Sequence, residues 1–435
     1  MACDCMRPHM KPNMKRNTDR FGIMVTDACA KTLRLVFGVV LGWFVGGGVG
    51  SSVAAEPVYI GFDRPYSGTA HSTVLAIELG TQLAISEING SGGVLNGRPL
   101  VLMTTDNRDV PAKAEDNFRA FANQDDLVAV YGSKTSSQTT PYWSLSNELG
   151  LVWVNVWGSA EPLAASPAEY PFVYHLSLRD KWAIPAMMRH AKATYGAQRL
   201  CSVLPKTPWG RHAEGGLAHH AKSFDQALVH VGWYGGKETE YSLLINRCVA
   251  EGAQAVILIA DEQSGAAWIK AMASQPVEQR LPTVAHWGLS GGAIDEVPRS
   301  DLNALAVDII QSFTFIRNER PVAEALGRTL LDDQRFTTLG SISSPAALAQ
   351  AYDATHLLAL AIDKAGSTER DQIRRAMQTI EVYDGAIRTY ERPFSDSNHD
   401  ALTAQQVLFV KLQPDGALYP IETHAKEAMR EEIVR

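Results

Sequence analysis

Residues 57–104 decide the fold, and they read PVYIGFDRPYSGTAHSTVLAIELGTQLAISEINGSGGVLNGRPLVLMT. The β-branched runs at 57–62 and 100–104 are typical of strands. Between them, apolar residues recur at helical spacing over 72–89. A strand, a helix and a second strand in this order form a βαβ unit, which predicts that the two strands are parallel.

The same alternation of strand and helix continues to residue 286. The next helices are expected at 112–123 and 141–149, and the next strands at 127–131 and 151–156. After Tyr174 the pattern begins again, with strands at 200–204, 228–233, 255–260 and 282–286 and helices at 210–223, 241–251 and 265–274. Apolar strands separated by helices predict parallel sheets covered on both faces. We therefore expect an α/β protein with two successive doubly wound units.

The last third of the chain is too short for another domain. It holds a strand within 305–315, helices at 321–331, 344–365 and 370–379, and segments with hairpin character at 385–390 and 407–411. We expect these elements to complete the first two units.

The N-terminal 55 residues differ from the rest. They carry seven Lys or Arg against three Asp, followed by the apolar run LVFGVVLGWFVGGGV at 35–49 and by small residues up to Ala55. This order is typical of a secretory signal peptide with a long n-region, cut before Glu56. The run is shorter than the roughly 20 residues of a membrane-spanning helix, so a permanent anchor is the weaker interpretation. Met24 is an alternative start.

The part of the chain that follows the leader is acidic and has two cysteines. The chain has 40 Lys and Arg and 47 Asp and Glu; without the leader, its net charge is −11. No basic patch with interleaved aromatic residues is present, so nucleic acid is not an expected partner. Of five Cys, only Cys201 and Cys248 follow the leader. They form either one disulfide or two buried free thiols.

The exported part has no HExxH, no phosphate-binding GxxxxGK[ST] and no CxxC. The Gly-rich stretch GLSGG at 288–292 fits the spelling GxSxG but lacks a strand-to-helix context. His212, His219 and His220 are the closest approach to a metal-binding cluster, but a solvated helix face explains them better. We expect no catalytic residue, no metal and no cofactor.

The segment 131–141, YGSKTSSQTTP, is the strongest candidate for binding. It follows a buried strand and opens a helix, so backbone N–H groups and hydroxyls gather where a helix N-terminus favours a carboxylate. The alternative is a helix capped by its own Ser and Thr. In open parallel sheets, ligands bind beyond the carboxyl ends of strands. The segments 155–159, 260–262 and 286–292 follow other strands in the same way, and together they predict a cleft.

These segments resemble the leucine/isoleucine/valine-binding group of periplasmic solute-binding proteins, which deliver ligands to ABC importers. The resemblance covers residues 57–422. It rests on the Pro65-Tyr66-Ser67-Gly68 turn, on the pattern INGSGGV at 88–94 with NGR at 96–98, and on the loop at 132–141. Further matches are PWG at 208–210, YDG at 383–385 and PFS at 393–395.

The resemblance implies a type I periplasmic binding protein fold. Such proteins have two α/β lobes joined by three hinge crossings, with the ligand trapped between the lobes. The implied lobes are residues 56–174 with 313–392 for lobe 1, and 175–312 with 393–435 for lobe 2. A hydroxyl in the loop matching Thr135 and Ser136, with one matching Ser159, is implied to bind the ligand carboxylate. The family's fold order places the helix with Cys248 across the strand with Cys201, which favours a disulfide.

The sequence departs from the family pattern at the ammonium site. Family members that bind α-amino acids hold the ammonium with an acidic residue in the loop matching 286–288, where this chain has Trp287. Asp261 or Glu262 is a candidate substitute. Tyr66, Trp157 and Trp287 are expected to form aromatic walls, which favour a flat or apolar ligand body. The two Trp residues could instead pack inside the lobes, or stack on a ligand cation.

We therefore expect a soluble, monomeric periplasmic receptor without catalysis. It would close on a small carboxylate-bearing molecule and deliver it to an ABC permease in the inner membrane. Ligand binding would shift the population towards the closed state. The family favours branched-chain amino acids, and the Trp residues favour aromatic acids. The alternative is a sensory or regulatory module that docks to a receptor. An exported enzyme ranks third.

Overall fold

The computed structural model describes residues 55–421, apart from 68–70, 133, 161–165 and 236–237. The predicted signal peptide therefore lies outside the described residues, except for Ala55. All of the described residues belong to one compact unit. None of the described helices is long and apolar enough to cross a membrane.

The first half of the chain forms a five-stranded parallel sheet in the order β2-β1-β3-β4-β5. The strands are β1 (Val58–Arg64), β2 (Leu100–Asp106), β3 (Leu127–Tyr131), β4 (Val152–Asn155) and β5 (Val173–His175). They alternate with α1 (His71–Gly90), α2 (Pro111–Ala122), α3 (Ser136–Thr139) and α4 (Tyr142–Leu149). The predicted βαβ unit at 57–104 is thus β1, α1 and β2.

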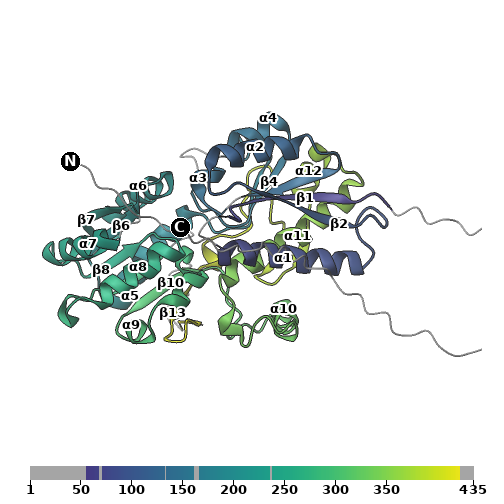
Figure 1. The fold of residues 1–435 in the computed structure, drawn as a ribbon. Helices are drawn as coiled ribbons and strands as arrows, with labels where there is room; N and C mark the ends of the chain where they lie inside the picture. Colours follow the sequence, from purple (N-terminus) through teal and green to yellow (C-terminus); the bar gives the residue numbers. More distant parts are fainter. Residues whose placement is uncertain (1–54, 68–70, 133, 161–165, 236–237, 422–435) are drawn as a thin grey trace, which may run out of the picture. The chain divides into compact units, whose positions relative to one another are not determined.

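Helices cover both faces of this sheet. α2 and α4 pack on one face around Trp153, and α1 packs on the other together with α11 (Pro345–Ala365), which returns from the C-terminal third (Figure 1). The Tyr131 hydroxyl on β3 lies 2.9 Å from the Thr355 hydroxyl on α11, so this helix sits directly on the strands. Coverage on both faces explains why β3 and β4 are apolar at nearly every position.

The second sheet has seven strands in the order β14-β13-β10-β9-β8-β6-β7. The parallel strands are β6 (Arg199–Pro205), β7 (Ala227–Tyr234), β8 (Ala255–Leu258), β9 (Thr283–Ala285) and β10 (Val307–Gln311). The antiparallel hairpin β13 (Leu408–Leu412) and β14 (Leu418–Pro420) extends the sheet beyond β10. The helices are α5 (Asp180–Tyr195), α6 (Pro208–Ser223), α7 (Glu238–Ala250), α8 (Glu262–Ala273) and α9 (Arg299–Asn303).

The remaining elements lie in the C-terminal third. They are α10 (Pro321–Asp332), α12 (Arg370–Met377) and the two-stranded ribbon of β11 (Val382–Asp384) and β12 (Thr389–Glu391). The described part of the chain also has five short 3₁₀ turns: Val277–Gln279, Trp287–Ser290, Gly292–Glu296, Leu339–Ser341 and Ala404–Gln406. Two parallel-sheet units covered by helices confirm the predicted α/β class.

The structure differs from the sequence-based expectation at several elements. β5 and the long helix α5 were not predicted; Pro185 lies inside α5, where proline normally argues against a helix. The helix expected at 141–149 is preceded by the short α3, which begins at Ser136. The predicted hairpin character at 385–390 is confirmed, because residues 385–388 form the turn between β11 and β12.

The chain crosses between the two sheets at three places. It passes from β5 to α5, from β10 towards α11, and from β12 to β13. We propose that lobe 1 is built on the five-stranded sheet and lobe 2 on the seven-stranded sheet, with the bounds given above. α10 follows the second crossing, and its apolar side chains join the core of buried residues that includes α11.

A disulfide joins Cys201 on β6 to Cys248 on α7. Their Cα atoms are 5.5 Å apart, and both side chains are fully buried. The bond ties a helix to the strand beneath it. This is the pairing that the family resemblance favours over two free thiols.

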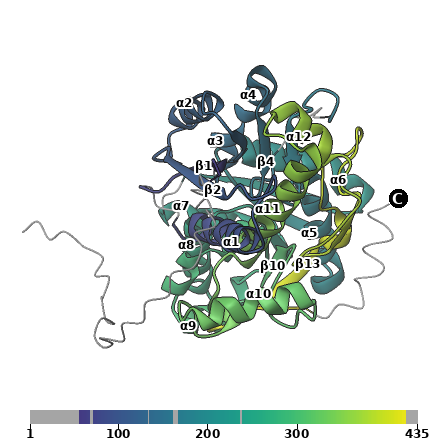
Figure 2. The ribbon, with the colours of Figure 1, turned by 90° about the vertical axis from the view of Figure 1, so that its right-hand side faces the viewer.

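Gly80 sets the distance between α1 and α11, which lie side by side (Figure 2). A Cβ atom at this position would lie 2.1 Å from the backbone oxygen of Leu348. We therefore expect Gly80→Ala to lower the free energy of unfolding by about 1–3 kcal/mol, because overpacking outweighs the gain in helix propensity. Urea denaturation followed by circular dichroism measures the change.

Gly215→Ala is the matched control. Gly215 is an exposed helical glycine in α6, and an added Cβ would meet no atom within 4 Å. This substitution should raise stability by about 0.5–1 kcal/mol. Equal effects of the two substitutions would contradict the close packing inferred at Gly80.

Candidate functional site

A cavity of about 460 Å³ lies beyond the carboxyl ends of the strands of both sheets. From the first sheet it is lined by the segments after β2, β3 and β4, and from the second by those after β6, β7, β8 and β9. This is the place where open parallel sheets bind ligands. The volume is within the range of small-molecule sites. Six of the seven predicted ligand-binding residues line it: Thr135, Ser136, Trp157, Ser159, Asp261 and Trp287.

Ser136 is the best placed hydroxyl for a ligand oxygen. It opens α3, it is 7% exposed, and its hydroxyl has no protein partner among the described residues. Thr135 is the N-cap of α3, and its backbone N–H donates to Gln138 Oε1 at 3.4 Å. α3 has only four residues, so its dipole adds little. The Ser136 hydroxyl is therefore available to donate to a ligand oxygen.

Ser159 lines the cavity next to the start of α5. Its carbonyl accepts from the N–H of Asp180, the first residue of that helix, at 3.3 Å. Its side chain is 4% exposed and lies close enough to the Asp180 carboxylate to help lower the pKa of that group. Its role as a second hydroxyl for the ligand carboxylate stays a prediction.

Asp180 lies buried behind the residues that line the cleft. Its two oxygens lie 3.1 Å from Nε2 of His286 and 3.1 Å from Nε1 of Trp209. Burial alone would raise the pKa of this carboxyl, but the hydrogen bond and charge of His286, with His212 and Ser159, outweigh it and lower the pKa. The ionised carboxylate holds both rings at the cavity.

Three Trp residues line the cavity. Trp157 and Trp287 are 5% and 3% exposed, and their rings meet edge to face with centroids 6.3 Å apart. Trp157 follows β4 and Trp287 follows β9, so this contact joins segments of the two sheets. Trp209, at the start of α6, is the third. The walls therefore offer flat apolar surface in several orientations.

Two carboxylates face the cavity from opposite sheets. Asp261 caps α8, with its Oδ1 accepting from the Ser264 N–H at 2.8 Å. Asp109 accepts a hydrogen bond from the Gln138 amide. Burial and the nearby charge of Asp261 raise the pKa of Asp109, although Lys134 opposes them. Mutual repulsion of this kind is relieved when a positive group lies between the two acids.

Lys134 and Glu262 form a buried ion pair beside the cavity. Lys134 Nζ lies 2.6 Å from Glu262 Oε1, and the two side chains are 4% and 3% exposed. Glu262 also accepts from the Ser72 hydroxyl, which in turn accepts from the Gly292 N–H at 2.7 Å. These contacts join the loop after β3 and the start of α1 to the loops of the second sheet. The cleft is thus bridged by polar contacts beside the Trp pair.

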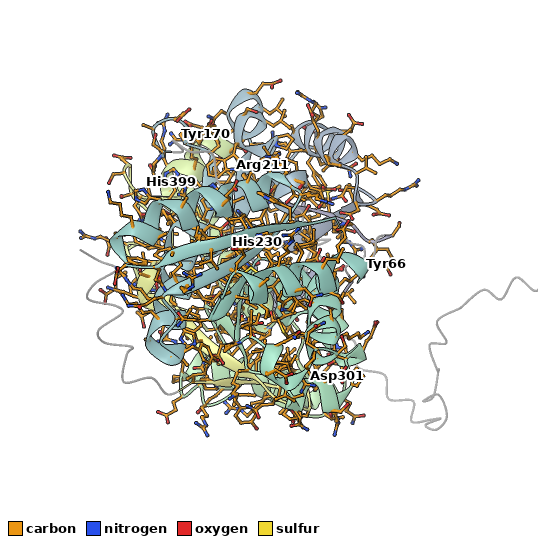
Figure 3. The ribbon with its side chains drawn as sticks, turned by 90° about the vertical axis from the view of Figure 1, so that its left-hand side faces the viewer. Tyr66, Tyr170, Arg211, His230, Asp301 and His399 are labelled. Carbon is orange, nitrogen blue, oxygen red and sulfur yellow. A yellow bond between two sulfur atoms is a disulfide. The ribbon has the colours of Figure 1, made fainter. Side chains whose placement is uncertain are left out.

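Tyr66 does not line the cavity, contrary to its predicted role as a third aromatic wall. The side chain is 54% exposed and lies at the margin of the ribbon in Figure 3. Its backbone N–H donates to Asp106 at 2.9 Å, and the Arg64 guanidinium stacks on its ring at 4.4 Å. These contacts fix the turn after β1 and hold the ring outside the cavity.

Sequence reasoning missed several residues of the site. Trp209 was quoted for its family pattern but was not assigned to the cleft. Asp180 is the first residue of α5, a helix that was not predicted because it contains Pro185, so no feature of the sequence indicated its role. Asp109 and Lys134 could have been found, because each follows a predicted strand at the carboxyl edge of the sheet. His286 lies in a segment that was predicted, next to Trp287.

The histidines of α6 make ring contacts. His219 and His220 meet with centroids 4.8 Å apart, and His220 stacks on Phe224. Within the described residues, no group of three or more His, Cys, Asp or Glu could hold a metal ion.

Two parallel-sheet units that share one cavity at their carboxyl edges define a two-lobed α/β ligand-binding protein. The chain belongs to the periplasmic binding protein family, whose model matches residues 57–417. This confirms the family that the sequence resembles. No curated protein sequence matches the chain significantly.

Solved structures with this fold have low sequence identity to the chain. A periplasmic binding protein type 1 from Bordetella pertussis Tohama I has a TM-score of 0.72 at 19% identity, covering 84% of this chain and 100% of its own. The substrate-binding protein LivJ from Streptococcus pneumoniae, in complex with isoleucine, gives 0.69 at 15%, with 85% and 100% covered. An ABC-transporter solute-binding protein from R. palustris, in complex with benzoate, gives 0.69 at 16%, with 84% and 95% covered. These neighbours confirm the type I periplasmic binding protein fold.

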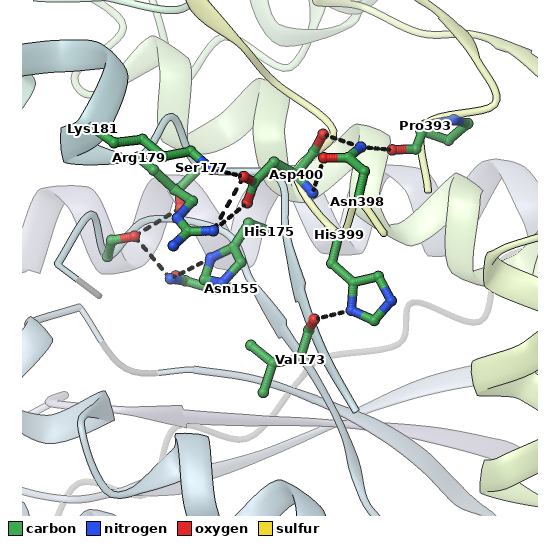
Figure 4. Close-up of polar contacts among 11 residues, drawn as sticks. Asn155, Val173, His175, Ser177, Arg179, Lys181, Pro393, Asn398, His399 and Asp400 are labelled. Carbon is green, nitrogen blue, oxygen red and sulfur yellow. Dashed lines mark hydrogen bonds and ion pairs between the residues drawn. The ribbon is translucent and has the colours of Figure 1, made fainter. Parts of the chain in front are cut away.

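A second polar cluster occupies the crossing between β5 and α5 (Figure 4). His175 ends β5 and pairs with the returning segment 399–401, where its N–H donates to the His399 carbonyl at 2.9 Å. Asp400 accepts from Arg179 Nη1 at 3.0 and 3.1 Å and from Lys181 Nζ at 2.6 Å. Burial lowers the pKa of both His175 and His399 to about 4.

These pKa shifts predict loss of stability in acid. The folded-state pKa of each histidine lies below its usual 6.5, so the unfolded chain binds protons first, and stability is lost as the pH falls from 6.5 to about 4. Each histidine should account for up to roughly 3 kcal/mol. We expect His399→Asn, which can keep a donor to the Val173 carbonyl, to lose less stability than the unchanged protein between pH 7.5 and 4.5.

Urea denaturation at the two pH values measures this difference. At pH 7.5 both proteins have a neutral side chain at position 399, so that value gives the cost of the substitution alone. An identical change in the free energy of unfolding for both proteins would contradict the assignment.

Because Lys134 and Glu262 form a buried ion pair, we expect the stability effects of substitutions at these two positions to be strongly coupled. Glu262→Gln alone leaves a buried ammonium without its counter-charge and should destabilise the fold by about 3–5 kcal/mol. The double variant Lys134→Met with Glu262→Gln should lose much less than the sum of the two single variants. Denaturant unfolding of the four proteins measures the coupling energy.

The exposed pair Arg328–Glu324 is the control. Its side chains are 68% and 50% exposed, with 3.8 Å between the charged atoms. Its coupling should be about 0.5 kcal/mol or less. Additive effects at positions 134 and 262 would show that the buried pair is not formed in solution.

Proposed function

We propose that this protein is the solute-binding component of an ABC importer in the periplasm, and that its ligand is a small aromatic carboxylate. The observation that carries the proposal is the cavity lined by Trp157, Trp209 and Trp287, with the Ser136 hydroxyl at its edge. In this proposal residues 1–55 direct export and are removed, and the closed protein delivers its ligand to an inner-membrane permease.

The chemistry of the cavity supports an aromatic ligand over a branched-chain one. A flat ring buries area against each indole and gains edge-to-face contacts, whereas an aliphatic side chain gains burial alone. The neighbours that bind isoleucine and benzoate indicate that one fold serves both ligand classes. Here Trp287 stands where the family's amino-acid binders place the acid that holds the ammonium.

The charges of the cavity are compatible with a carboxylate. Lys134 and Lys206 line it together with Asp109 and Asp261. The charge of Lys134 is already balanced by Glu262, so Lys206 is the lining cation that can attract a carboxylate. Ser136 donates to the carboxylate, and Ser159 lines the same cavity as a second hydroxyl. Closure follows from contact with both lobes, because a ligand that touches both stabilises only the closed state.

A thermal-shift screen tests the ligand class. A ligand at 100 times its Kd adds about 2.7 kcal/mol to the free energy of unfolding. We expect a rise in Tm with benzoate and related aromatic carboxylates, and none with leucine, isoleucine or valine. A rise with the aliphatic amino acids alone would mean that Asp261 or Asp109 holds an ammonium and that the aromatic proposal is wrong.

Two variants connect the ligand to the site. Ser136→Ala and Trp287→Ala should each weaken binding about tenfold or more, which equals about 1.4 kcal/mol. Ser144→Ala is the matched control, because Ser144 is an exposed hydroxyl in α4 outside the cavity. Calorimetric titration with the best ligand of the screen measures all three. Unchanged affinity in both cleft variants would place the ligand elsewhere.

A further inference from the structure

A set of polar contacts joins the two sheet units beside the cleft. One side consists of the loop after β3, the first turn of α1 and the start of α11. The other side consists of the first residue of α8 and the segment 290–292, which follows β9. We call this set the lobe interface, and its residues are Ser72, Lys134, Glu262, Ser290, Gly292 and Ser344. Of these, only Lys134 also lines the cleft cavity.

The carboxylate of Glu262 is the charged centre of the lobe interface. Its Oε1 lies 2.6 Å from Lys134 Nζ, and its Oε2 accepts from the Ser72 hydroxyl. Both donors belong to the unit of the first sheet, whereas Glu262 belongs to the second. A buried ion pair offsets the loss of hydration only where further hydrogen bonds satisfy the remaining lone pairs. Ser72 supplies such a bond, so separation of the two units would remove both contacts of this carboxylate together.

Two backbone hydrogen bonds extend the lobe interface. The Ser72 hydroxyl oxygen accepts from the Gly292 N–H at 2.7 Å, and the Ser344 N–H donates to the Ser290 carbonyl at 2.8 Å. Ser344 is fully buried, and its hydroxyl lies 2.7 Å from that of Thr73. This contact fixes the start of α11 against α1, so the two helices present one continuous surface to the segment 290–292.

Gly292 lies too close to α1 for a larger residue. A Cβ atom at this position would lie 3.0 Å from Cβ of Ser72 and 3.5 Å from the Ser343 hydroxyl, both on the side of the first sheet. The φ of Gly292 is outside the left-handed region, so the backbone itself accepts other residues. A larger side chain here would therefore force the two units apart without changing a residue of the cavity lining.

We propose that the lobe interface keeps the protein closed in the absence of ligand, and that it thereby sets part of the ligand affinity from outside the cavity. The inference rests on the proposed function, because it assumes that the cleft closes around a ligand. All contacts of the interface are between groups of the protein itself, so the free protein can form them. Together with the contact between Trp157 and Trp287, they favour closure before a ligand binds. Ser72 and Gly292 are then positioning residues for ligand binding.

The fraction of closed molecules determines the apparent affinity. Only the closed form contacts the ligand from both lobes, so the apparent Kd is the Kd of the closed form divided by the closed fraction. A substitution that lowers this fraction to one tenth weakens binding about tenfold, although no ligand contact is lost. Ser136→Ala differs, because it removes a ligand contact and leaves the lobe interface intact.

Small-angle X-ray scattering of the exported protein without ligand tests the proposal. We expect a larger radius of gyration in Gly292→Val and in Ser72→Ala than in the unchanged protein. Gly215→Val and Ser144→Ala are the matched controls and should scatter like the unchanged protein. An added Cβ at Gly215 meets no atom within 4 Å, and Ser144 is an exposed residue of α4.

Calorimetric titration with benzoate tests the effect on affinity. Gly292→Val should bind benzoate about tenfold or more weakly than the unchanged protein. Ser136→Ala should also bind it more weakly, but with an unchanged radius of gyration. The comparison separates the loss of closure from the loss of a ligand contact, which a merely structural role of Gly292 would not do.

The proposal is overturned if Gly292→Val and Ser72→Ala both keep the radius of gyration of the unchanged protein. It is also overturned if Gly292→Val expands the protein and still binds benzoate with unchanged affinity. Ser72 is only partly buried, so its variant should fold even where Gly292→Val does not. If no aromatic carboxylate binds, the proposed function fails, and the scattering of the free proteins still decides whether the lobe interface keeps them closed.

Discussion

The buried carboxylate of Asp180 is the interaction on which the cleft depends. Removing an ion from water costs several kcal/mol, and Asp180 offsets that cost with donors from two different segments. Those donors are the Trp209 indole and the His286 imidazole. The Asp180 N–H also donates to the Ser159 carbonyl at 3.3 Å. Since Ser159 follows β4 and the two rings follow β6 and β9, the contacts of this one residue join the loops of both sheets. The orientation of two cavity-lining rings follows directly from it.

The contacts across the cleft define what a ligand must add. The Lys134–Glu262 pair and the Trp157–Trp287 contact already join the loops of the two sheets. A ligand stabilises the closed form only by its differential affinity for that form over the open one. With the ion pair buried and satisfied, the remaining differential affinity has to come from the three indoles and the free hydroxyl of Ser136. This is the physical reason why the body of the ligand matters more here than its charge.

Much of the architecture could be predicted from the sequence. Apolar strands separated by helices form parallel sheets, and parallel strands bring their carboxyl ends to one edge of the sheet. The loops with Ser136, Trp157 and Trp287 follow such strands, so the sequence was enough to place them together at the cleft. The position of Tyr66 was not predictable, because the turn after β1 is oriented by Asp106, 40 residues further along the chain. Asp180 and α5 were missed because Pro185 contradicts a helix locally, while packing against α6 and the second sheet stabilises it.

The cleft and the crossing between β5 and α5 are connected through one side chain. Asn155 Oδ1 accepts from the Trp157 N–H, its Nδ2 donates to the Gly158 carbonyl, and the same Nδ2 lies 3.2 Å from Nδ1 of His175. Trp157 and Gly158 line the cleft, and His175 ends β5 where the chain crosses between the sheets. Both N–H donors of the Asn155 amide are used by these bonds, so a movement of the crossing at His175 acts on the loop that carries Trp157. The same amide therefore holds both the crossing segment and one aromatic wall of the cleft.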